Sequence, residues 1–316
     1  MWFLIKNTRR ALLAFSLLLN GLLIVVSLLY LANSKQKCVE IASITSRNLT
    51  HVIQHEISNQ LYLSDVVMQS VAAYFTQLKT NSLATDRVVN PYLEQQRALL
   101  QRVAFLRIFD KNGNAIFGTD NLQLNIADRD YFKAAQKDPV PKLILSKPYK
   151  AKLGGKWSLY LARRLNDQQG GFAGIVYAGY RLSSFSDYFS HINVGKGLVV
   201  LMDADMGYLA GYPERAGGDD VIGTKHVAPE VAALIPGGAD SGTTPLYVSS
   251  GSKATRLSSF SRIAPYPLIA LVSLGGDDFL APWYNEIRIV SVGMLLFTLV
   301  NLFFINLFMK AQICRH

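Results

Sequence analysis

The chain has 316 residues and a formal net charge of +10, and half of its residues are hydrophobic. The hydrophobic residues gather in two blocks at the ends, with a mixed globular composition between them. The basic charge does not indicate a nucleic-acid partner, because no basic stripe with interleaved aromatic residues is present. The two cysteines, Cys38 and Cys314, provide neither a disulfide framework nor a metal-type spacing.

The first apolar block covers residues 11–32 and carries no charge. About 20 apolar residues match the thickness of a bilayer core, so this block predicts a transmembrane helix. A cleaved signal peptide is the alternative. Its apolar region would span about 7–15 residues and end in a small-residue cleavage site. The run here is longer, and Tyr30-Leu31-Ala32 is a poor cleavage site.

Residues 287–309 predict a second transmembrane helix, with Asn301 and Asn306 as polar guests that either face a partner helix or are tolerated passengers. Basic residues flank both spans: Lys6, Arg9, Arg10, Lys310 and Arg315. The positive-inside bias therefore predicts that residues 1–10 and 310–316 are cytoplasmic and that residues 33–285 are extracytoplasmic.

A long amphipathic pattern follows the first span and predicts a stalk helix over residues 36–80, continuous with the membrane helix. Its apolar stripe consists of Leu49, Ile53, Ile57, Leu61, Met68, Ala72, Phe75 and Leu78. Such a stalk packs against globular domains, against its twin in a homodimer, or against both. Cys38, near the start of the stalk, either bridges two chains or is a free thiol. His51 and His55 lack a third metal ligand beyond Glu56, so no metal site is predicted.

Strand patterns begin near residue 103 and define a first module over residues 81–190. The Asn112-Gly113 turn supplies the positive φ that a hairpin needs. A short helix near Asp128 carries Arg129, Tyr131 and Phe132. The predicted strands of this module cover residues 103–109, 115–118, 143–149, 157–165 and 171–180.

A second module over residues 191–280 repeats the same order of hairpin, helical or irregular segment, and meander. Its predicted strands cover residues 197–202, 208–212, 243–248, 255–263 and 268–273. The predicted fold class is α+β: a long N-terminal stalk helix with two tandem PAS-like modules, each with an antiparallel sheet, flanked by two transmembrane helices.

The motifs occur in a known order: Ile108-Phe109-Asp110-Lys111-Asn112-Gly113, then Asp128-Arg129-Asp130-Tyr131-Phe132, then the strand Trp157–Leu165 with Arg163-Arg164, then Gly171–Val176. Over roughly residues 40–280 this order resembles a double Cache (dCache) domain, a periplasmic sensor of bacterial receptors. The resemblance implies an inner-membrane protein with a ligand pocket in the membrane-distal first module. It also implies that the helix with Arg129 and Tyr131 forms a lid, and that the membrane-proximal module transmits the signal.

Eight residues are predicted to bind the ligand: Arg129, Tyr131, Trp157, Tyr160, Arg163, Tyr177, Lys147 and Asp110. The planar fork of Arg129 suits a carboxylate, although a surface pair with Asp128 or Asp130 is the alternative. Tyr131 offers a hydroxyl and an aromatic wall, or else is a half-buried core residue. Period two places Trp157 and Arg163 on one face of their strand and Tyr160 and Arg164 on the other, so only one of these pairs faces the pocket.

The resemblance also indicates the ligand class. Family members that bind amino acids share an Arg-x-Trp-Tyr element and a later Asp for the ligand amine. Here Tyr131 and Phe132 replace the aromatic pair, and the Asp position falls at about Gly179. A small organic acid is therefore favoured over an amino acid or amine, with Asp110 as the alternative amine ligand.

No nucleophile elbow, phosphate loop or paired acid motif is found, so the sequence predicts neither an enzyme nor a cofactor. The resemblance implies a membrane-anchored sensor, the ligand-binding half of a receptor of the diguanylate cyclase type or a histidine kinase. No output motif follows Met309, and a truncated receptor is the expectation. A stand-alone solute-binding accessory protein, acting through a partner kinase or transporter, is the alternative.

Overall fold

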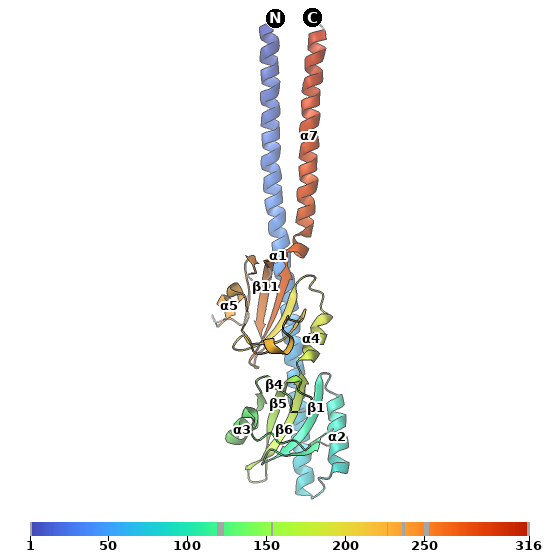
Figure 1. Ribbon diagram of the computed structural model, residues 1–316, viewed down its shortest axis with the longest axis vertical. Helices are drawn as coiled ribbons and strands as arrows, with labels where there is room; N and C mark the ends of the chain where they lie inside the picture. The colour runs from blue at the N-terminus through green and yellow to red at the C-terminus, as the bar shows by residue number, and fades with distance from the viewer. Residues whose placement is uncertain are drawn as a thin grey trace.

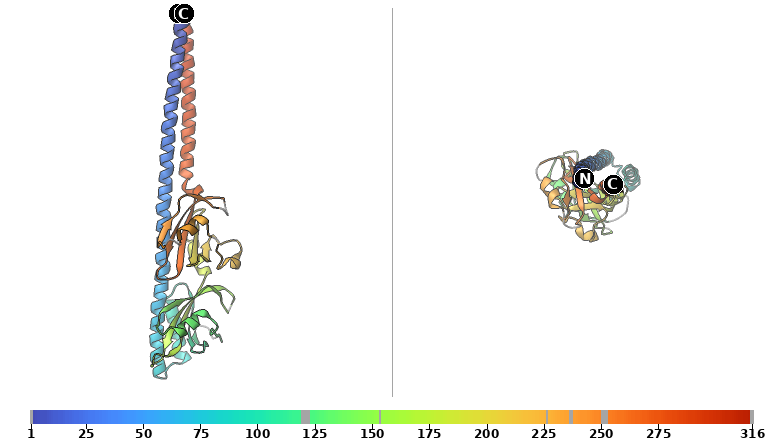
Figure 2. Two further views of the ribbon diagram at one scale, coloured as in Figure 1. Left: turned by 90° about the vertical axis from the view of Figure 1, so that its left-hand side faces the viewer. Right: turned by 90° about the horizontal axis from the view of Figure 1, so that it is seen from above.

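The computed structural model describes residues 2–118, 123–152, 154–225, 227–235, 238–249 and 253–314, so Arg315 lies outside the described part. The molecule is elongated, with both termini at one end (Figure 1). Helices α1 (Trp2–Thr80) and α7 (Ala281–Cys314) run side by side from that end. Two modules are attached to one side of the remaining length of α1 (Figure 2). We call them the proximal and the distal module, by their distance from the termini.

Helix α1 joins the predicted apolar block and the predicted stalk in one continuous helix of 79 residues. Both α1 and α7 contain a stretch long and apolar enough to cross a membrane. Asn20 Oδ1 accepts a hydrogen bond from Thr298 Oγ1 at 2.8 Å and links the two apolar stretches. Of the two asparagines noted in the second block, Asn301 is half-buried and Asn306 is exposed.

The predicted apolar stripe of the stalk is the face of α1 that packs on both modules. Ile53, Ile57, Leu61 and Met68 are all buried to 2% exposure or less. Spacings of three and four residues keep these side chains on one side of a helix, so one stripe can serve two sheets in succession.

The distal module contains a six-stranded antiparallel sheet with the order β2-β1-β6-β5-β3 and β4 paired to β5. One face packs on α1 and α2, and α3 covers the other. Its elements are α2 (Asp86–Ala98), β1 (Val103–Asp110), β2 (Ala115–Gly118), α3 (Asp130–Lys137), β3 (Leu143–Leu145), β4 (Tyr149–Lys150), β5 (Trp157–Asn166) and β6 (Phe172–Arg181). Helix α4 (Ser183–Ser190) follows β6 and lies beside the proximal module (Figure 1).

The proximal module repeats this plan with the order β10-β11-β12-β7-β8 and β9 paired to β11. One face packs on α1, and α5 covers the other. Its elements are β7 (Leu198–Asp203), β8 (Tyr208–Tyr212), η1 (Gly218–Val221), α5 (Pro229–Leu234), β9 (Ser241–Thr243), β10 (Tyr247–Val248), β11 (Thr255–Arg262), β12 (Leu268–Gly275) and α6 (Gly276–Phe279).

Two predicted strands are each divided in the structure. Residues 143–149 form β3 and β4, because Ser146 leaves the regular ladder and its Oγ accepts the amide of Tyr160 at 2.9 Å. Residues 243–248 form β9 and β10, and Thr244 between them makes the same contact with the amide of Ser258 at 3.0 Å. In both modules a hydroxyl replaces a backbone acceptor at the break.

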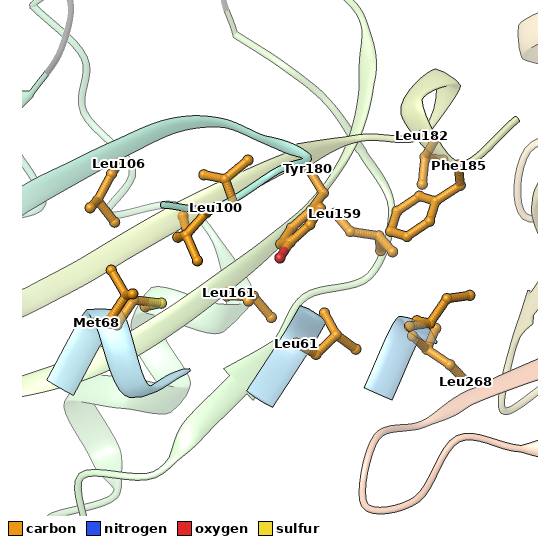
Figure 3. Close-up of a cluster of buried hydrophobic side chains, with 14 of the residues drawn as sticks. Leu61, Met68, Leu100, Leu106, Leu159, Leu161, Tyr180, Leu182, Phe185 and Leu268 are labelled. Carbon is orange, nitrogen blue, oxygen red and sulfur yellow. The ribbon is translucent and has the colours of Figure 1, made fainter. Parts of the chain in front are cut away.

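The main hydrophobic core lies between α1 and the two sheets. Leu61 and Met68 of α1 face Leu161 and Tyr180 of the distal sheet, and Leu268 of the proximal module joins the same cluster (Figure 3). The Tyr180 hydroxyl lies 2.5 Å from Ser64 Oγ, and burial raises the pKa of Tyr180 to about 12. The stalk is therefore part of both cores.

Candidate functional site

Aromatic residues gather between α3 and the face of the distal sheet that points away from the stalk. We call Phe105, Tyr131, Tyr149, Tyr160 and Tyr177 the distal aromatic cluster. Ring centroids of Tyr160 and Tyr177 are 4.9 Å apart, and the Tyr131 ring lies 5.7 Å from Tyr160. The Phe105 ring stacks on Tyr177 at 5.7 Å. The side-chain period of two places these strand residues on one face while their neighbours face α1.

The rings of the cluster occupy the space under α3. Tyr131 is only 2% exposed. Burial raises the pKa of both Tyr131 and Tyr177 well above the ordinary value, so both hydroxyls stay protonated near neutral pH. A ligand that enters must move α3 or rearrange the rings, and it would then meet neutral hydroxyl groups able to donate hydrogen bonds.

Arg129 occupies the N-cap position of α3, at the rim of the cluster, and its side chain makes no capping hydrogen bond. Its guanidinium lies 4.5 Å from the centroid of the Tyr149 ring. Its Nε is 3.9 Å from Asp128 Oδ2, a loose contact, and Asp128 is bound more closely by Lys152 Nζ at 2.6 Å. Arg129 can therefore turn to an anionic ligand without leaving Asp128 unpaired.

Arg107 places a second guanidinium beside the cluster and was not among the predicted site residues. It is 3% exposed and lies opposite Tyr177 in the pairing of β1 with β6. Its guanidinium lies 4.8 Å from the centroid of the Phe105 ring. The signal in the sequence was an arginine between Phe105 and Phe109 on one face of a strand, a position that is normally apolar.

Gly179 lies beside Phe105 and Tyr160 in the sheet. A Cβ atom at position 179 would overlap the Phe105 ring. Phe105 therefore fills the space into which a side chain from this position would project. An acidic side chain cannot reach the cluster from position 179 in this arrangement.

Arg164 holds the other end of α3. Its Nη1 donates hydrogen bonds to the carbonyl oxygens of Ala135, Gln136 and Asp138 at 2.9, 2.8 and 3.2 Å. At the end of a helix no backbone amide is available to donate to these carbonyl oxygens. The guanidinium of Arg164 supplies the hydrogen bonds that they lack. Helix α3 is thus anchored to β5 at its C-terminal end, while its N-terminal end carries Arg129 and Tyr131.

The structure brings together four of the eight predicted residues, Arg129, Tyr131, Tyr160 and Tyr177, and separates the other four. Trp157 and Arg163 lie on the stalk face of β5, where Arg163 Nη1 pairs with Asp65 Oδ1 at 2.6 Å. Lys147 is exposed between β3 and β4. The Asp110 carboxylate accepts the backbone amides of Asn112 and Asn114 at 2.9 and 2.8 Å, which fixes the β1–β2 turn.

A family model described as Cache domain matches residues 32–283. The search of curated proteins returns no match. Among solved structures, the extracellular domain of rpHK1S-Z16, described as a histidine kinase, aligns with a TM-score of 0.66 at 21% identity, covering 78% of this chain and 99% of that one.

Two chemoreceptor ligand-binding domains are also similar in fold. The domain of Campylobacter jejuni Tlp3 in complex with 4-methylisoleucine has a TM-score of 0.57 at 13% identity, covering 77% of this chain and 94% of that one. The domain of Pseudomonas fluorescens CtaA in complex with L-isoleucine has a TM-score of 0.57 at 16% identity, covering 78% and 98%.

Proposed function

The chain belongs to the Cache domain family, and from that membership we propose that it is a membrane-anchored sensor that binds a small organic acid at the distal aromatic cluster. The observation that carries this proposal is the chemistry of the cluster. Tyr131 and Tyr177 offer protonated hydroxyls, Arg129 supplies positive charge at the rim, and Phe105 excludes a side chain from position 179.

The ligand class follows from charge. The related chemoreceptor domains were solved with 4-methylisoleucine and L-isoleucine, whose ammonium groups need a negative or carbonyl partner. In this chain Asp110 is engaged by its own turn, and position 179 is a glycine. Without a carboxylate at position 179, the cluster favours an anion over an ammonium group, and Arg129 can bind a carboxylate in bidentate geometry.

Signal transmission would use the two central strands of the distal sheet. Tyr160 and Tyr177 face the cluster from β5 and β6. On the opposite faces of the same strands, Arg163 pairs with Asp65 of α1, and Tyr180 contacts Ser64. A ligand that binds one arrangement of these strands more tightly would bias the position of α1.

The apolar stretches of α1 and α7 are proposed to anchor the protein in the inner membrane, with both modules in the periplasm. The Arg163-Arg164 strand resembles the sensors of diguanylate cyclases and histidine kinases, and we propose that the chain is of the diguanylate cyclase type. We further propose a homodimer formed through α1, whose face opposite the buried stripe exposes Ile41, Ile44 and Val52.

A thermal-shift screen of the full chain in lipid nanodiscs tests the ligand class. Small mono- and dicarboxylates are compared with amino acids and amines. A bound acid at about 100 times its Kd should stabilise the fold by about 2.7 kcal/mol. Arg129→Ala should remove this stabilisation, while Arg87→Ala, at an exposed position of α2, should keep it. Stabilisation by amines or amino acids alone would overturn the proposal.

A further inference from the structure

The proximal module contains a cavity of about 420 Å³ on the face of its sheet that points away from α1. The floor is apolar and comes from Leu198 and Val200 of β7 and Leu271 of β12. Helix α5 and the residues before it form the cover. The volume lies within the range of small-molecule sites in proteins. This cavity corresponds in position to the distal aromatic cluster, but here the space is open.

Arg256 of β11 is the residue that gives this cavity a chemical preference. It lines the cavity, and its Nη1 atom is buried without a hydrogen-bond partner among the described residues. A guanidinium cannot release its proton at physiological pH, so the burial of Nη1 leaves part of a positive group without a hydrogen bond. A carboxylate oxygen is the partner that best relieves this, through a charge-assisted hydrogen bond.

The rest of the lining supports the same class of ligand. Arg215 also lines the cavity, with its guanidinium 5.4 Å from the centroid of the Tyr208 ring. Hydroxyl groups of Tyr247 and Ser273 are present, and none of the described lining residues is acidic. We propose that this cavity is a second ligand site, which takes a small carboxylate with an apolar body.

The strands that line the cavity also contact α1 and lead to α7. The carbonyl of Val272, between Leu271 and Ser273, accepts a hydrogen bond from Ser46 Oγ at 3.2 Å. The carbonyl of Ser259 on β11 accepts one from Thr50 Oγ1 at 3.3 Å. Strand β12 continues through α6 into α7. A ligand here would act on both long helices, nearer the termini than the contacts of the distal module.

The test is a titration of the full chain in lipid nanodiscs with benzoate and with hexanoate, read out as the thermal unfolding midpoint. Benzamide and hexanamide are the matched neutral probes. At least one carboxylate should raise the midpoint saturably, and its amide should not. Arg256→Met should weaken the response at least tenfold, while Arg129→Ala, in the distal site, should leave it intact.

The unliganded midpoint of Arg256→Met is the control for folding. Because the substitution removes a buried Nη1 atom that has no hydrogen-bond partner among the described residues, that midpoint should stay equal or rise. Arg256→Lys, which keeps a cation but not the planar fork, should weaken binding less than Arg256→Met. A carboxylate response that survives Arg256→Met, disappears in Arg129→Ala, or is matched by the amides would overturn the second site. A carboxylate response that is lost in Arg256→Met and kept in Arg129→Ala comes from the second site, and the reverse pattern comes from the proposed distal site.

Discussion

At the scale of single residues, Gly179 and Phe105 set the shape of the distal aromatic cluster. Because a Cβ at position 179 would overlap the Phe105 ring, Gly179→Ala should lower the free energy of unfolding by about 1–3 kcal/mol. Urea unfolding of the full chain in nanodiscs measures this loss. In a Phe105→Ala background the same substitution should cost much less. An equal cost in both backgrounds would mean that the ring is not the obstacle.

The buried hydroxyl of Tyr131 should make the free energy of unfolding depend on pH in the alkaline range. Burial holds its pKa above the ordinary value of about 10 in the folded state. Between the two values the native state keeps a proton that the unfolded state releases, so the free energy of unfolding falls as pH rises above 10. Each such tyrosine contributes a slope of up to about 1.4 kcal/mol per pH unit.

Tyr131→Phe should therefore make the fall in stability between pH 10 and 11 shallower by up to that amount. Urea unfolding at pH 9, 10 and 11 gives the slope. Tyr62→Phe is the matched control, because Tyr62 lies on α1 with 64% exposure. If both variants have the slope of the parent chain, Tyr131 is not protected from ionisation as its burial requires.

The sequence could predict which residues of a strand share a face, but not which face meets the ligand. Trp157 and Tyr160 begin the same strand on opposite faces, and both faces of the distal sheet are covered. The alternation of side chains cannot identify the face that meets the ligand, because the side chains on both faces of this strand are mainly apolar. Only the packing of α1 against the Trp157 face decides it. Arg107 was missed for a different reason, because a buried arginine is rare in a strand.

At the scale of elements, one partly buried ion pair adds to the apolar packing between β5 and α1. Asp65 and Arg163 are 19% and 15% exposed, with 2.6 Å between the charged atoms. Asp65→Asn should cost about 1–3 kcal/mol, between an exposed pair and a fully buried one. Lys196 and Asp277, at 72% and 71% exposure, provide the control, and Asp277→Asn should have little effect. Similar losses in urea unfolding for both variants would contradict this ranking.

Elements with a strong period were predicted, and those set by tertiary contacts were not. The stripe of the stalk and the long strands followed from spacings of four and two. Helix α2 contains Pro91 in its interior, a residue that normally ends a helix, so its sequence argued against it. Helix α5 has six residues, too few for a helical period to show. Packing against the cores of the modules stabilises α2 and α5, although their own sequences do not indicate a helix.

At the scale of the whole molecule, α1 has two apolar faces with different roles. The buried face packs on both modules, while Ile41, Ile44, Val52 and Tyr62 remain at least half exposed on the other. An apolar strip of this length on a water-exposed helix indicates a partner surface. A second copy of α1 would cover it and bring the two chains of a receptor together along the stalk.

Cys38 provides a direct test of that pairing, because it is free and lies just before the exposed face. A disulfide requires the two Cα atoms to lie within about 7 Å. In native membranes, mild oxidation of a Cys314→Ser chain should give a covalent dimer through Cys38. In a background that also carries Cys38→Ser, Ile41→Cys should cross-link, whereas Ile53→Cys should not, because Ile53 is buried against the modules. Equal cross-linking at positions 41 and 53 would indicate random collision instead of a stalk dimer.

If the distal site moves α1, a bound acid should change the rate of disulfide formation at Cys38. Asp65→Asn should abolish that change in rate while leaving the dimer in place.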